Sequence, residues 1–467
     1  MRYEEMETTV LAITRLAPAD QLVAIQGSFS GPIPCTEVEY VFRLQRRGGS
    51  TVEHRRIAGE EPRLEWSGLQ NGVDYQLALT AYHRRTGAAL GEAPTRLFRP
   101  GSVPGVSVNY IHPDDYTFNT SGRSPASPSL LRLPQGRLLA SHDIYWGQGG
   151  QNLTKVFYSD DEGRSWSYLS TVYPCFWGTL FLHRGQVYML AVSTEYGQLQ
   201  VFGSPDGGRT WTRPVRIFPG GSRQTGGPHK APVPIVQHQG RLWTAVEYGS
   251  WQTGGHAAGV VSVAEDSDLL SAQAWTVSAF TDYDPQWPGT VCGGHPSVLE
   301  GNMVVTPDGE LVNVLRYDTK DAVPDYGRAI ILAVDSSRPE SAPVFRDVID
   351  FPGNMSKFTI RFHPETQCYY ALVNRVTTDW VSQRNVLSLV SSPDLVNWTI
   401  QRDLLNYEDN GWPEDKHQVG FQYVDWLFHE DSIWALSRTA LNGAYNYHNA
   451  NHITFHKFAR QTRGESL

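Results

Sequence analysis

Short runs in which apolar and polar residues alternate make up the first part of the chain. Examples within residues 1–100 are "QLVAIQGSF", "EVEYVFRLQ" and "YQLALTAYHR", and turn residues separate them. Alternation with a period of two puts the apolar side chains of a strand on one face. We therefore expect these residues to form a small antiparallel β-sandwich. The stretch "FRPGSVPG", residues 98–105, is predicted to be the linker that follows it.

From residue 106 on, one unit recurs: an apolar strand, a tight turn and a second apolar strand. The copies are "SLLRLPQGRLLASHD", "TLFLHRGQVYMLAV", "PVPIVQHQGRLWTAVE", "NMVVTPDGELVNVLR", "TIRFHPETQCYYALVN" and "YVDWLFHEDSIWALSR". They are spaced by roughly 50 to 70 residues, which is typical of β-propeller blades with loop insertions. The pattern predicts an all-β fold with a six-bladed propeller over residues 106–462; a long insertion that hides one blade would make it seven.

The last unit lacks a fourth strand. Its final strand is "ANHITFHKF", and no further apolar run follows it. The segment "GVSVNYI", residues 105–111, precedes the first unit and has the composition of a strand. We expect it to pair with the last blade and so to close the ring.

A short box appears twice, as "YSDDEGRSW" and "GSPDGGRTW", and in shortened form as "SSPDLVNW". Each copy falls between the predicted third and fourth strands of a blade. Its Asp can accept backbone N–H groups of its own turn, its Gly adopts an angle other residues resist, and its Trp can pack between blades. Copies on different blades cannot converge on one substrate, so this Asp box is predicted to be structural.

Asp boxes on a propeller of this size resemble those of the sialidases and their relatives. Separately, "LEWSGLQNGVDYQLALTAY" resembles the late strands of a fibronectin type III domain. The sialidase resemblance implies a site with three arginines that bind a substrate carboxylate. It also implies a Tyr nucleophile paired with a Glu, and an Asp that acts as acid and base. A neutral Tyr suits a reacting carbon that carries a carboxylate, because an anionic nucleophile would be repelled.

Four residues match the sialidase pattern by position. Glu300 and Arg316 stand at the two ends of the hairpin "EGNMVVTPDGELVNVLR", where sialidases place their Glu and second Arg. Arg384 begins a strand that leads into an Asp box and matches the third Arg. Tyr423 begins the strand "YVDWLFHEDSIW" and matches the nucleophile. The resemblance thus assigns Tyr423 and Glu300 to catalysis, and the two arginines to substrate binding.

Two parts of the sialidase pattern are missing. Ala126 stands where the first Arg is expected, with Arg123 nearby in sequence, and the loop "IYWGQGGQN" has no carboxylate to act as acid. Ahead of that loop are His142 and Asp143, at the end of a predicted inner strand. A His offers proton transfer near neutral pH. The pattern therefore also resembles a sialidase-like branch that acts on rhamnose linked to glucuronate and uses a first-blade His, here His142.

Several other residues are candidates for substrate binding, each with a structural alternative. His229 could instead bond to backbone groups, and Trp177 could pack between blades. The charged groups of Lys357 and Arg361 could instead face solvent or pair with carboxylates of the protein. Arg438 could replace the missing first Arg or form a salt bridge. The full set is His229, Lys230, Lys357, Arg361, Trp177 and Arg438.

Composition narrows the possible ligands. Charged residues make up 19% and aromatic residues 12%, as in a globular protein. The net charge is −9 and no basic run is present, which argues against nucleic acid as a partner. No apolar run approaches membrane-spanning length. The start "MRYEEMETTV" has no apolar leader segment, so we expect an intracellular protein; a secreted protein with a trimmed leader is the alternative.

No motif for a cofactor or a metal emerges. The four cysteines are scattered and form no CxxC pair, so neither a disulfide framework nor a zinc site is expected. The segment "YNYHNANHITFHKF" carries three His and three Asn. Because its second half has a strand pattern, the histidines share no helical face, and polar contacts in a loop are expected instead.

Three functions remain open. The first is an exo-acting glycoside hydrolase that removes a terminal sugar from an acidic glycan, uronate- or sialate-containing, but is not an ordinary sialidase. The second is a polysaccharide lyase of the rhamnose–glucuronate type that acts by β-elimination. The third is a carbohydrate-binding propeller without catalysis. The retained Tyr423 and Glu300 favour an enzyme, since a lectin needs no such pair.

Overall fold

The computed structural model describes residues 9–147, 149–410, 412 and 414–460. The first eight residues of the predicted sandwich and the last two of the predicted propeller lie outside this part. Within it, strands β1–β33 account for almost all regular structure, and the single α-helix, α1 (Tyr407–Asn410), has four residues. The all-β prediction is confirmed.

The N-terminal residues form two antiparallel sheets over one hydrophobic core. One sheet contains β1 (Val10–Ala19), β2 (Leu22–Ser30) and β5 (Arg63–Ser67). The other contains β3 (Val38–Arg46), β4 (Val52–Ala58), β6 (Tyr75–His83), β7 (Ala89–Glu92) and β8 (Arg96–Phe98). Buried side chains of both sheets share the core, among them Leu16 and Trp66 of the first and Phe42 and Leu79 of the second. This is the burial that alternation along the strands predicts.

Six further sheets follow, each built from consecutive antiparallel strands. The first holds β10 (Ser124–Arg132), β11 (Leu138–Tyr145), β12 (Thr154–Ser159) and β13 (Ser167–Val172), and the second holds β14 (Phe176–His183), β15 (Gln186–Val192), β16 (Leu199–Ser204) and β17 (Val215–Phe218). The third holds β18 (Gly227–His229), β19 (Val236–His238), β20 (Arg241–Ser250), β21 (Gly255–Ala264) and β22 (Trp275–Val277). The fourth holds β23 (Ser297–Val305), β24 (Leu311–Asp318), β25 (Arg328–Val334) and β26 (Val344–Asp350).

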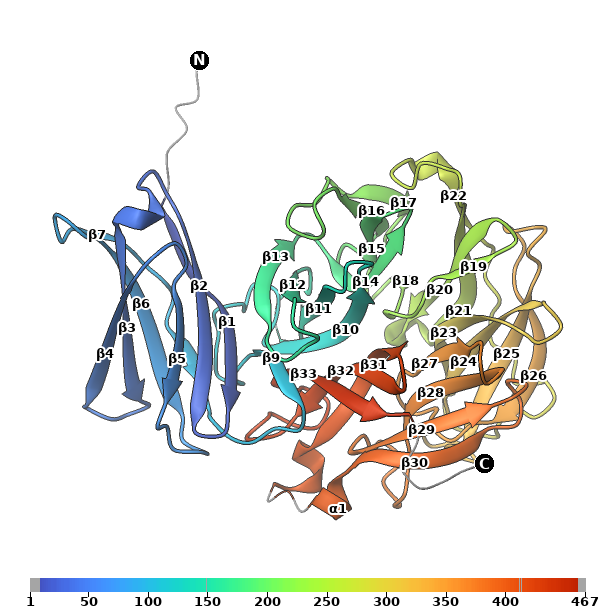
Figure 1. The fold of residues 1–467 in the computed structure, drawn as a ribbon. Coiled ribbons are helices and arrows are strands. Elements are labelled where there is room, and N and C mark those ends of the chain that lie inside the picture. The colour runs from blue at the N-terminus through green and yellow to red at the C-terminus, as the bar shows by residue number, and fades with distance from the viewer. Residues whose placement is uncertain (1–8, 148, 411, 413, 461–467) are drawn as a thin grey trace.

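The fifth sheet holds β27 (Thr359–His363), β28 (Cys368–Asn374), β29 (Val386–Ser392) and β30 (Thr399–Asn406), and the sixth holds β31 (Gly420–His429), β32 (Ser432–Ala440) and β33 (His452–Ala459). The strand β9 (Val106–Tyr110) completes the sixth sheet by pairing with β33, as the sequence predicts. The six sheets follow one another around a common centre, and β10 of the first contacts β31 of the sixth (Figure 1). The strands β9 and β33, which are far apart in sequence, thus pair and close the ring of six sheets.

The first strands of four sheets carry the same irregularity. Each contains a β-bulge with a non-glycine residue in the left-handed backbone region: Ser127 (φ 49°), Trp177 (φ 53°), Glu300 (φ 53°) and Tyr423 (φ 55°). A bulge re-aims a side chain, and left-handed backbone at a non-glycine residue is strained. The four bulges therefore mark the end of the sheets at which side chains are directed to a common place.

The Asp boxes lie at the opposite end of the sheets. Each turn joins the third and fourth strands of its sheet, as predicted. Asp161 accepts hydrogen bonds from the backbone N–H of Ser165 (2.9 Å) and from the hydroxyls of Ser159 and Ser165. A Cβ at Gly163 would lie 2.1 Å from the Phe455 ring of the sixth sheet, so only glycine fits there. The box is a self-contained turn that also lets neighbouring sheets pack closely.

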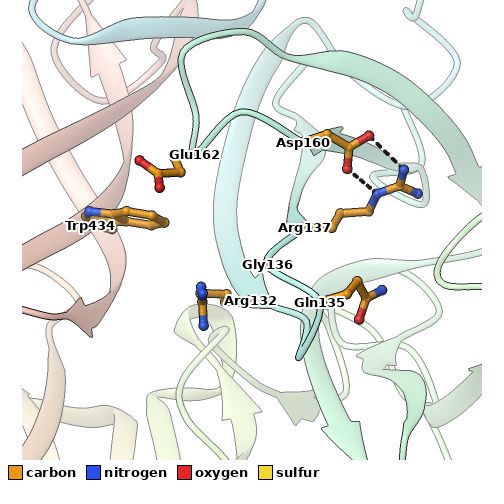
Figure 2. Close-up of a pocket in the computed structure, with 7 residues that line it drawn as sticks. All are labelled: Arg132, Gln135, Gly136, Arg137, Asp160, Glu162 and Trp434. Carbon is orange, nitrogen blue, oxygen red and sulfur yellow. Dashed lines mark hydrogen bonds and ion pairs between the residues drawn. The ribbon is translucent and has the colours of Figure 1, made fainter.

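A pocket of about 570 Å³ opens beside the first of these turns (Figure 2). Its walls carry Asp160 and Glu162 of the turn, Arg132 at the end of β10 and Trp434 of β32. Asp160 pairs with Arg137 through two hydrogen bonds of 2.6 and 2.7 Å. Along β10, this pocket is about five residues, or roughly 17 Å, from the end of the sheets that carries the bulges.

The two N-terminal sheets lie beside β9 and the first of the six sheets (Figure 1). Buried charged groups connect the two regions. Arg15 donates to two carbonyl oxygens of β9. Arg96 and Asp115 form an ion pair of 2.5 Å with both side chains 1% exposed. Lys155 of β12 donates to the carbonyl of Thr14 in β1. Burying these groups is tolerable only because each is bonded, which ties the two regions together.

Candidate active site

A cavity of about 260 Å³ opens at the bulged end of the sheets. Seven of the twelve site residues predicted from the sequence line it: Trp177, His229, Glu300, Arg316, Arg384, Tyr423 and Arg438. The remaining lining residues are Ser127, Tyr145, Glu195, Tyr196, Trp251, Leu299, Asp318 and His448. Side chains of five sheets and several loops thus meet in one place.

Arg316 of β24 connects the groups at the centre of this cavity. One guanidinium nitrogen donates to Glu300 (2.8 Å) and to the phenolic oxygen of Tyr423 (3.3 Å), and the other donates to Asp318 (2.8 Å). Burial alone would raise the pKa of Glu300, but the Arg316 charge and hydrogen bond outweigh it, and that pKa is lowered. Glu300 is therefore an ionised carboxylate that shares one Arg316 nitrogen with the Tyr423 hydroxyl.

Two more arginines flank the tyrosine ring. The guanidinium carbons of Arg384 and Arg438 lie 5.6 and 5.3 Å from the centre of the Tyr423 ring. Arg384 donates to the side-chain oxygen of Gln422 (2.7 Å) and to the carbonyl of Met355 (3.1 Å), and Arg438 donates to the carbonyl of His448. These partners are uncharged. The cavity therefore holds two guanidinium groups whose hydrogen bonds here go to uncharged groups, and such guanidinium groups suit a substrate anion.

The carboxylates that line the cavity are each paired with an arginine. Glu300 and Asp318 share Arg316, and Glu195 pairs with Arg223 and accepts a hydrogen bond from Gln151 (2.8 Å). An ion pair favours the ionised form of a carboxylate. Each of these three carboxylates therefore lies beside a guanidinium group.

A histidine and a glutamate form a buried pair on another wall. His229 Nδ1 lies 3.0 Å from Glu247 Oε2, and the Trp177 ring packs against the imidazole at 4.3 Å between ring centres. The carboxylate fixes the orientation of the imidazole. With Nδ1 bound to Glu247, Nε2 is the nitrogen that can exchange a proton with a ligand. The sequence predicts substrate binding or a backbone contact for His229, and its contact with Glu247 is an additional finding.

Buried carboxylates behind the cavity hold its bulges in place. Asp143 accepts the backbone N–H of Trp177 (2.8 Å), and Glu247 accepts that of Gly301, next to Glu300 (3.0 Å). Asp425 of the sixth sheet likewise accepts a backbone N–H from β10 of the first sheet, at 2.8 Å. In each case a carboxylate of one sheet satisfies an N–H group in the next. The strained backbone of the cavity is thus supported from behind.

His142 and Asp143, predicted as catalytic, do not line the cavity. His142 is 1% exposed, and its ring nitrogens lie 2.9 Å from the Asn109 amide and 3.0 Å from the Asp143 carbonyl. Burial lowers the pKa of His142 to about 3, so the ring is neutral. Both residues lie on β11, the second strand of its sheet, behind β10. We therefore correct their assignment: Asp143 supports Trp177, and His142 packs in the sheet.

The predicted binding residues Lys230, Lys357 and Arg361 also lie outside the cavity lining. Lys230 donates to the Thr179 hydroxyl (2.5 Å), and Lys357 donates to the Val424 carbonyl (3.0 Å). Burial lowers their pKa values, to about 7 and about 8. Arg361 pairs with Asp425 at 3.2 Å. These cations therefore make contacts within the protein, which is the structural alternative that the sequence left open.

Some lining residues were not among the predicted ones. Asp318 stands two residues after Arg316, and the strand period of two would have placed it on the same face. His448 belongs to the His- and Asn-rich segment for which only loop contacts were expected. Burial and the nearby Arg438 lower the pKa of His448 well below its ordinary value. Trp251 lies in a one-turn helix, η2 (Trp251–Thr253), which no sequence pattern predicted.

Within the described ranges, no cluster of three or more His, Cys, Asp or Glu side chains is placed to hold a metal ion. No helix in that part of the chain is long and apolar enough to cross a membrane.

Comparisons with known proteins relate the chain to solved structures only. No family model matches it, and no curated protein matches it by sequence. It is similar to an α-L-arabinanase of Penicillium chrysogenum complexed with arabinobiose, with a TM-score of 0.50 and 14% identity over 77% of this chain and 99% of that one. It is also similar to an α-L-arabinofuranosidase of Fusarium graminearum bound to an iminosugar inhibitor, with a TM-score of 0.52 and 13% identity over 76% and 98%. At such identities the likeness shows a shared propeller-like fold.

Proposed function

We propose that this protein is a glycoside hydrolase that removes a terminal sugar bearing an anionic group from a glycan. The observation that carries the proposal is the convergence of Tyr423, Glu300 and three arginines in one cavity. At about 260 Å³ the cavity is just below the usual size of ligand pockets, about 300–1,000 Å³, and suits one sugar rather than a chain. The neighbouring solved structures, which are carbohydrate-active enzymes by name, are consistent with this class.

We infer further that the six sheets are the blades of a six-bladed propeller and that the two N-terminal sheets form a fibronectin type III-like β-sandwich. The closing strand β9 supports the blade count, because it completes four strands in the sixth sheet. The shared core of the N-terminal sheets supports the sandwich. The convergence of Tyr423, Glu300, Arg316 and Arg384 in one cavity supports the roles that the sialidase resemblance implies for them, and we infer that Arg438 replaces the missing first arginine.

The proposed mechanism begins with Tyr423 as nucleophile. Arg384 and Arg438 bind the anionic group of the sugar and present its anomeric carbon to the phenolic oxygen. As that oxygen forms a bond to the carbon, Glu300 accepts the phenolic proton, and Arg316 holds the two groups side by side. The glycosidic C–O bond breaks, and His229, oriented by Glu247, donates a proton to the leaving oxygen.

The second step restores the enzyme. A water molecule gives a proton to His229 and attacks the anomeric carbon, and the bond to Tyr423 breaks. The phenolate then recovers its proton from Glu300. Two displacements at the same carbon predict that the released sugar keeps its configuration, as in retaining glycosidases.

The experiment that tests the proposal is a screen of acidic glycans, including sialosides and rhamnosyl-glucuronates, with the released sugars identified by mass spectrometry and NMR. Release of one acidic monosaccharide, abolished in Tyr423→Phe, is the expected result. Saturable binding without turnover would favour the carbohydrate-binding alternative. Release of internal fragments would contradict an exo-acting enzyme.

A polysaccharide lyase is the second candidate, and Arg384 and Arg438, whose hydrogen bonds go to uncharged groups, favour it because they can bind a uronate carboxylate. Glu300 would take the phenolic proton of Tyr423, Tyr423 would remove the proton beside that carboxylate, and an arginine would stabilise the resulting enolate. The proton returns to the leaving oxygen, and the product carries a C=C bond. Ultraviolet absorbance of that unsaturated uronate separates the two reactions, since hydrolysis produces none.

A further inference from the structure

A second cavity, of about 310 Å³, lies next to the candidate active site. It sits between the third and fourth sheets, at the end of β20 and the starts of β21 and β23. The lining residues are Thr225, Gly226, Tyr248, Gly249, Thr253, Gly254, Gly255, His256, Ala257, Asp282, Tyr283, Pro296 and Ser297. None of them has a role in the proposed mechanism.

One imidazole ring forms the wall between the two cavities. His256 lines the second cavity, and its ring centre lies 4.8 Å from that of His229, 5.3 Å from that of Trp251 and 6.0 Å from that of Tyr196. Those three side chains line the first cavity. A substrate whose terminal sugar fills the first cavity therefore has its next sugar within reach of the second.

The backbone of the second cavity is shaped by glycines. Gly249 has a φ of 142°, and a Cβ there would lie 2.2 Å from the carbonyl oxygen of Gly255, so no other residue fits. Gly254 has a φ of 97°, and a Cβ there would meet nothing within 4 Å. At the first position glycine permits close backbone approach, and at the second it leaves open space. Glycines with these two properties line places where a ligand or another backbone comes close.

The second cavity differs from the first in charge. Neither lysine nor arginine occurs among its described lining residues, and Asp282 is the single carboxylate in that set. Burial, with smaller contributions from the nearby His229 and Arg316, lowers the pKa of His256 to about 2, so this wall stays neutral. Tyr248 and Tyr283 add aromatic surface. Aromatic faces with a hydroxyl-accepting carboxylate suit a sugar, and an anionic sugar would be repelled by Asp282.

We propose that the second cavity binds the next sugar of the substrate and that this sugar is uncharged. The inference rests on the proposed function, because it takes the first cavity as the site of the terminal anionic sugar. The arginines of the first cavity then select the anionic terminal sugar. The second cavity, lined by glycines and tyrosines, selects the neutral sugar next to it, which is the leaving group. The substrate class becomes an acidic sugar capping a neutral glycan.

The test compares two substrates of the same terminal acidic sugar: an aryl glycoside, which has no second sugar, and a disaccharide with a neutral second sugar. The variants are Asp282→Ala and Tyr248→Leu, and the matched controls outside the cavity are Asp266→Ala and Tyr326→Leu. In the two cavity variants, KM for the disaccharide should rise about tenfold, while kinetics on the aryl glycoside stay within about twofold. The aryl glycoside also reports that each variant is folded.

Equal effects on both substrates, or no effect on either, would overturn the assignment. A disaccharide with a uronate as second sugar should be cleaved at least about tenfold less efficiently by the wild type; equal efficiency would overturn the charge preference. If the wild type cleaves no substrate, the proposed function is wrong, and the cavity is tested by titration with lactose. Quenching of tryptophan fluorescence that saturates in wild type and is lost in Asp282→Ala would then support the site, and no saturable quenching would overturn it.

Discussion

The two ends of the six sheets use carboxylates in opposite ways. At the far end, Asp161, Asp206 and Asp394 lie near the surface and accept hydrogen bonds from their own turns. At the cavity end, Asp143 and Glu247 are buried and accept N–H groups from the neighbouring sheet. The first arrangement is local and repeats with the sheets. The second differs from sheet to sheet and supports the backbone of individual cavity residues.

The backbone of the two ends differs in where positive φ angles occur. The far-end turns have positive φ at glycine, as at Gly163 (82°), and also at other residues, as at Glu162 (60°) and Leu395 (68°), so these angles belong to tight turns. At the cavity end, Glu300 and Tyr423 have positive φ within strands, at bulges that direct their side chains into the cavity. Substitutions at the two ends should therefore affect different properties.

The largest effect is expected for Tyr423→Phe. Removing the proposed nucleophile should lower kcat about a thousandfold or more, since loss of a nucleophile has effects of at least this size in other enzymes. Tyr158→Phe, in the first Asp box, is the matched control and should retain turnover. Steady-state kinetics on the released acidic sugar checks both. A Tyr423→Phe enzyme with full turnover would remove the tyrosine from the mechanism.

A smaller loss is expected for Arg438→Lys and Arg384→Lys. Lysine keeps the charge but not the planar fork that binds an anion through two hydrogen bonds, so kcat/KM should fall about ten- to hundredfold. Arg132→Lys, in the far-end pocket of Figure 2, is the control and should leave kcat/KM unchanged. If a neutral analogue of the substrate lost as much as the acidic one, the arginines would not be binding its anionic group.

Asp143→Asn should lower kcat/KM about tenfold, because an amide has one acceptor oxygen for the two hydrogen bonds from Trp177 and Thr154. It should also change the pH dependence of stability. Burial raises the pKa of Asp143 to about 7, against the opposing hydrogen bonds. The folded protein thus keeps a proton that the unfolded chain releases near pH 4, and its free energy of unfolding falls as pH rises from about 4 to 7.

The asparagine variant lacks this titration, so its stability relative to wild type should rise over the same range. Thermal unfolding of both proteins at several pH values between about 4 and 8 measures the difference. Parallel curves would mean that Asp143 does not titrate in this range, and unchanged kcat/KM would mean that it does not position Trp177.

The smallest effect on activity is expected for Asp161→Ala. The turn loses the acceptor for Ser165, so the free energy of unfolding should fall by about 1–3 kcal/mol while kcat/KM stays unchanged. Urea unfolding and steady-state kinetics on one preparation check both parts. A loss of kcat/KM at unchanged stability would contradict the separation of the two ends.

The fold was predictable because its signals are local. Alternation within strands, the recurring hairpin and the strand-like segment 105–111 each report on a few consecutive residues. The all-β architecture and the pairing of β9 with β33 followed from them. The Asp boxes were equally local, since each carboxylate is satisfied within its own turn.

The residues that line the cavity were predictable only in part, because lining it depends on the length of a side chain as well as on the strand that carries it. Arg316 and Arg438 stand on the second strands of their sheets, and their long side chains extend to the cavity past the first strand. His142 also stands on a second strand, but its shorter side chain stays within the sheet. The bulges at Trp177 and Tyr423 interrupt the alternation of side chains along their strands, and the sequence pattern does not predict them.

The central claim is that Tyr423 forms a covalent bond to the sugar that is released. The most direct measurement uses a fluorinated glycosyl fluoride of that sugar, which slows the second step, followed by digestion and mass spectrometry. We expect the mass of one fluorosugar on the peptide that contains Tyr423, and none in Tyr423→Phe. A label on another residue, or an active enzyme that forms no adduct and releases an unsaturated product, would contradict the account.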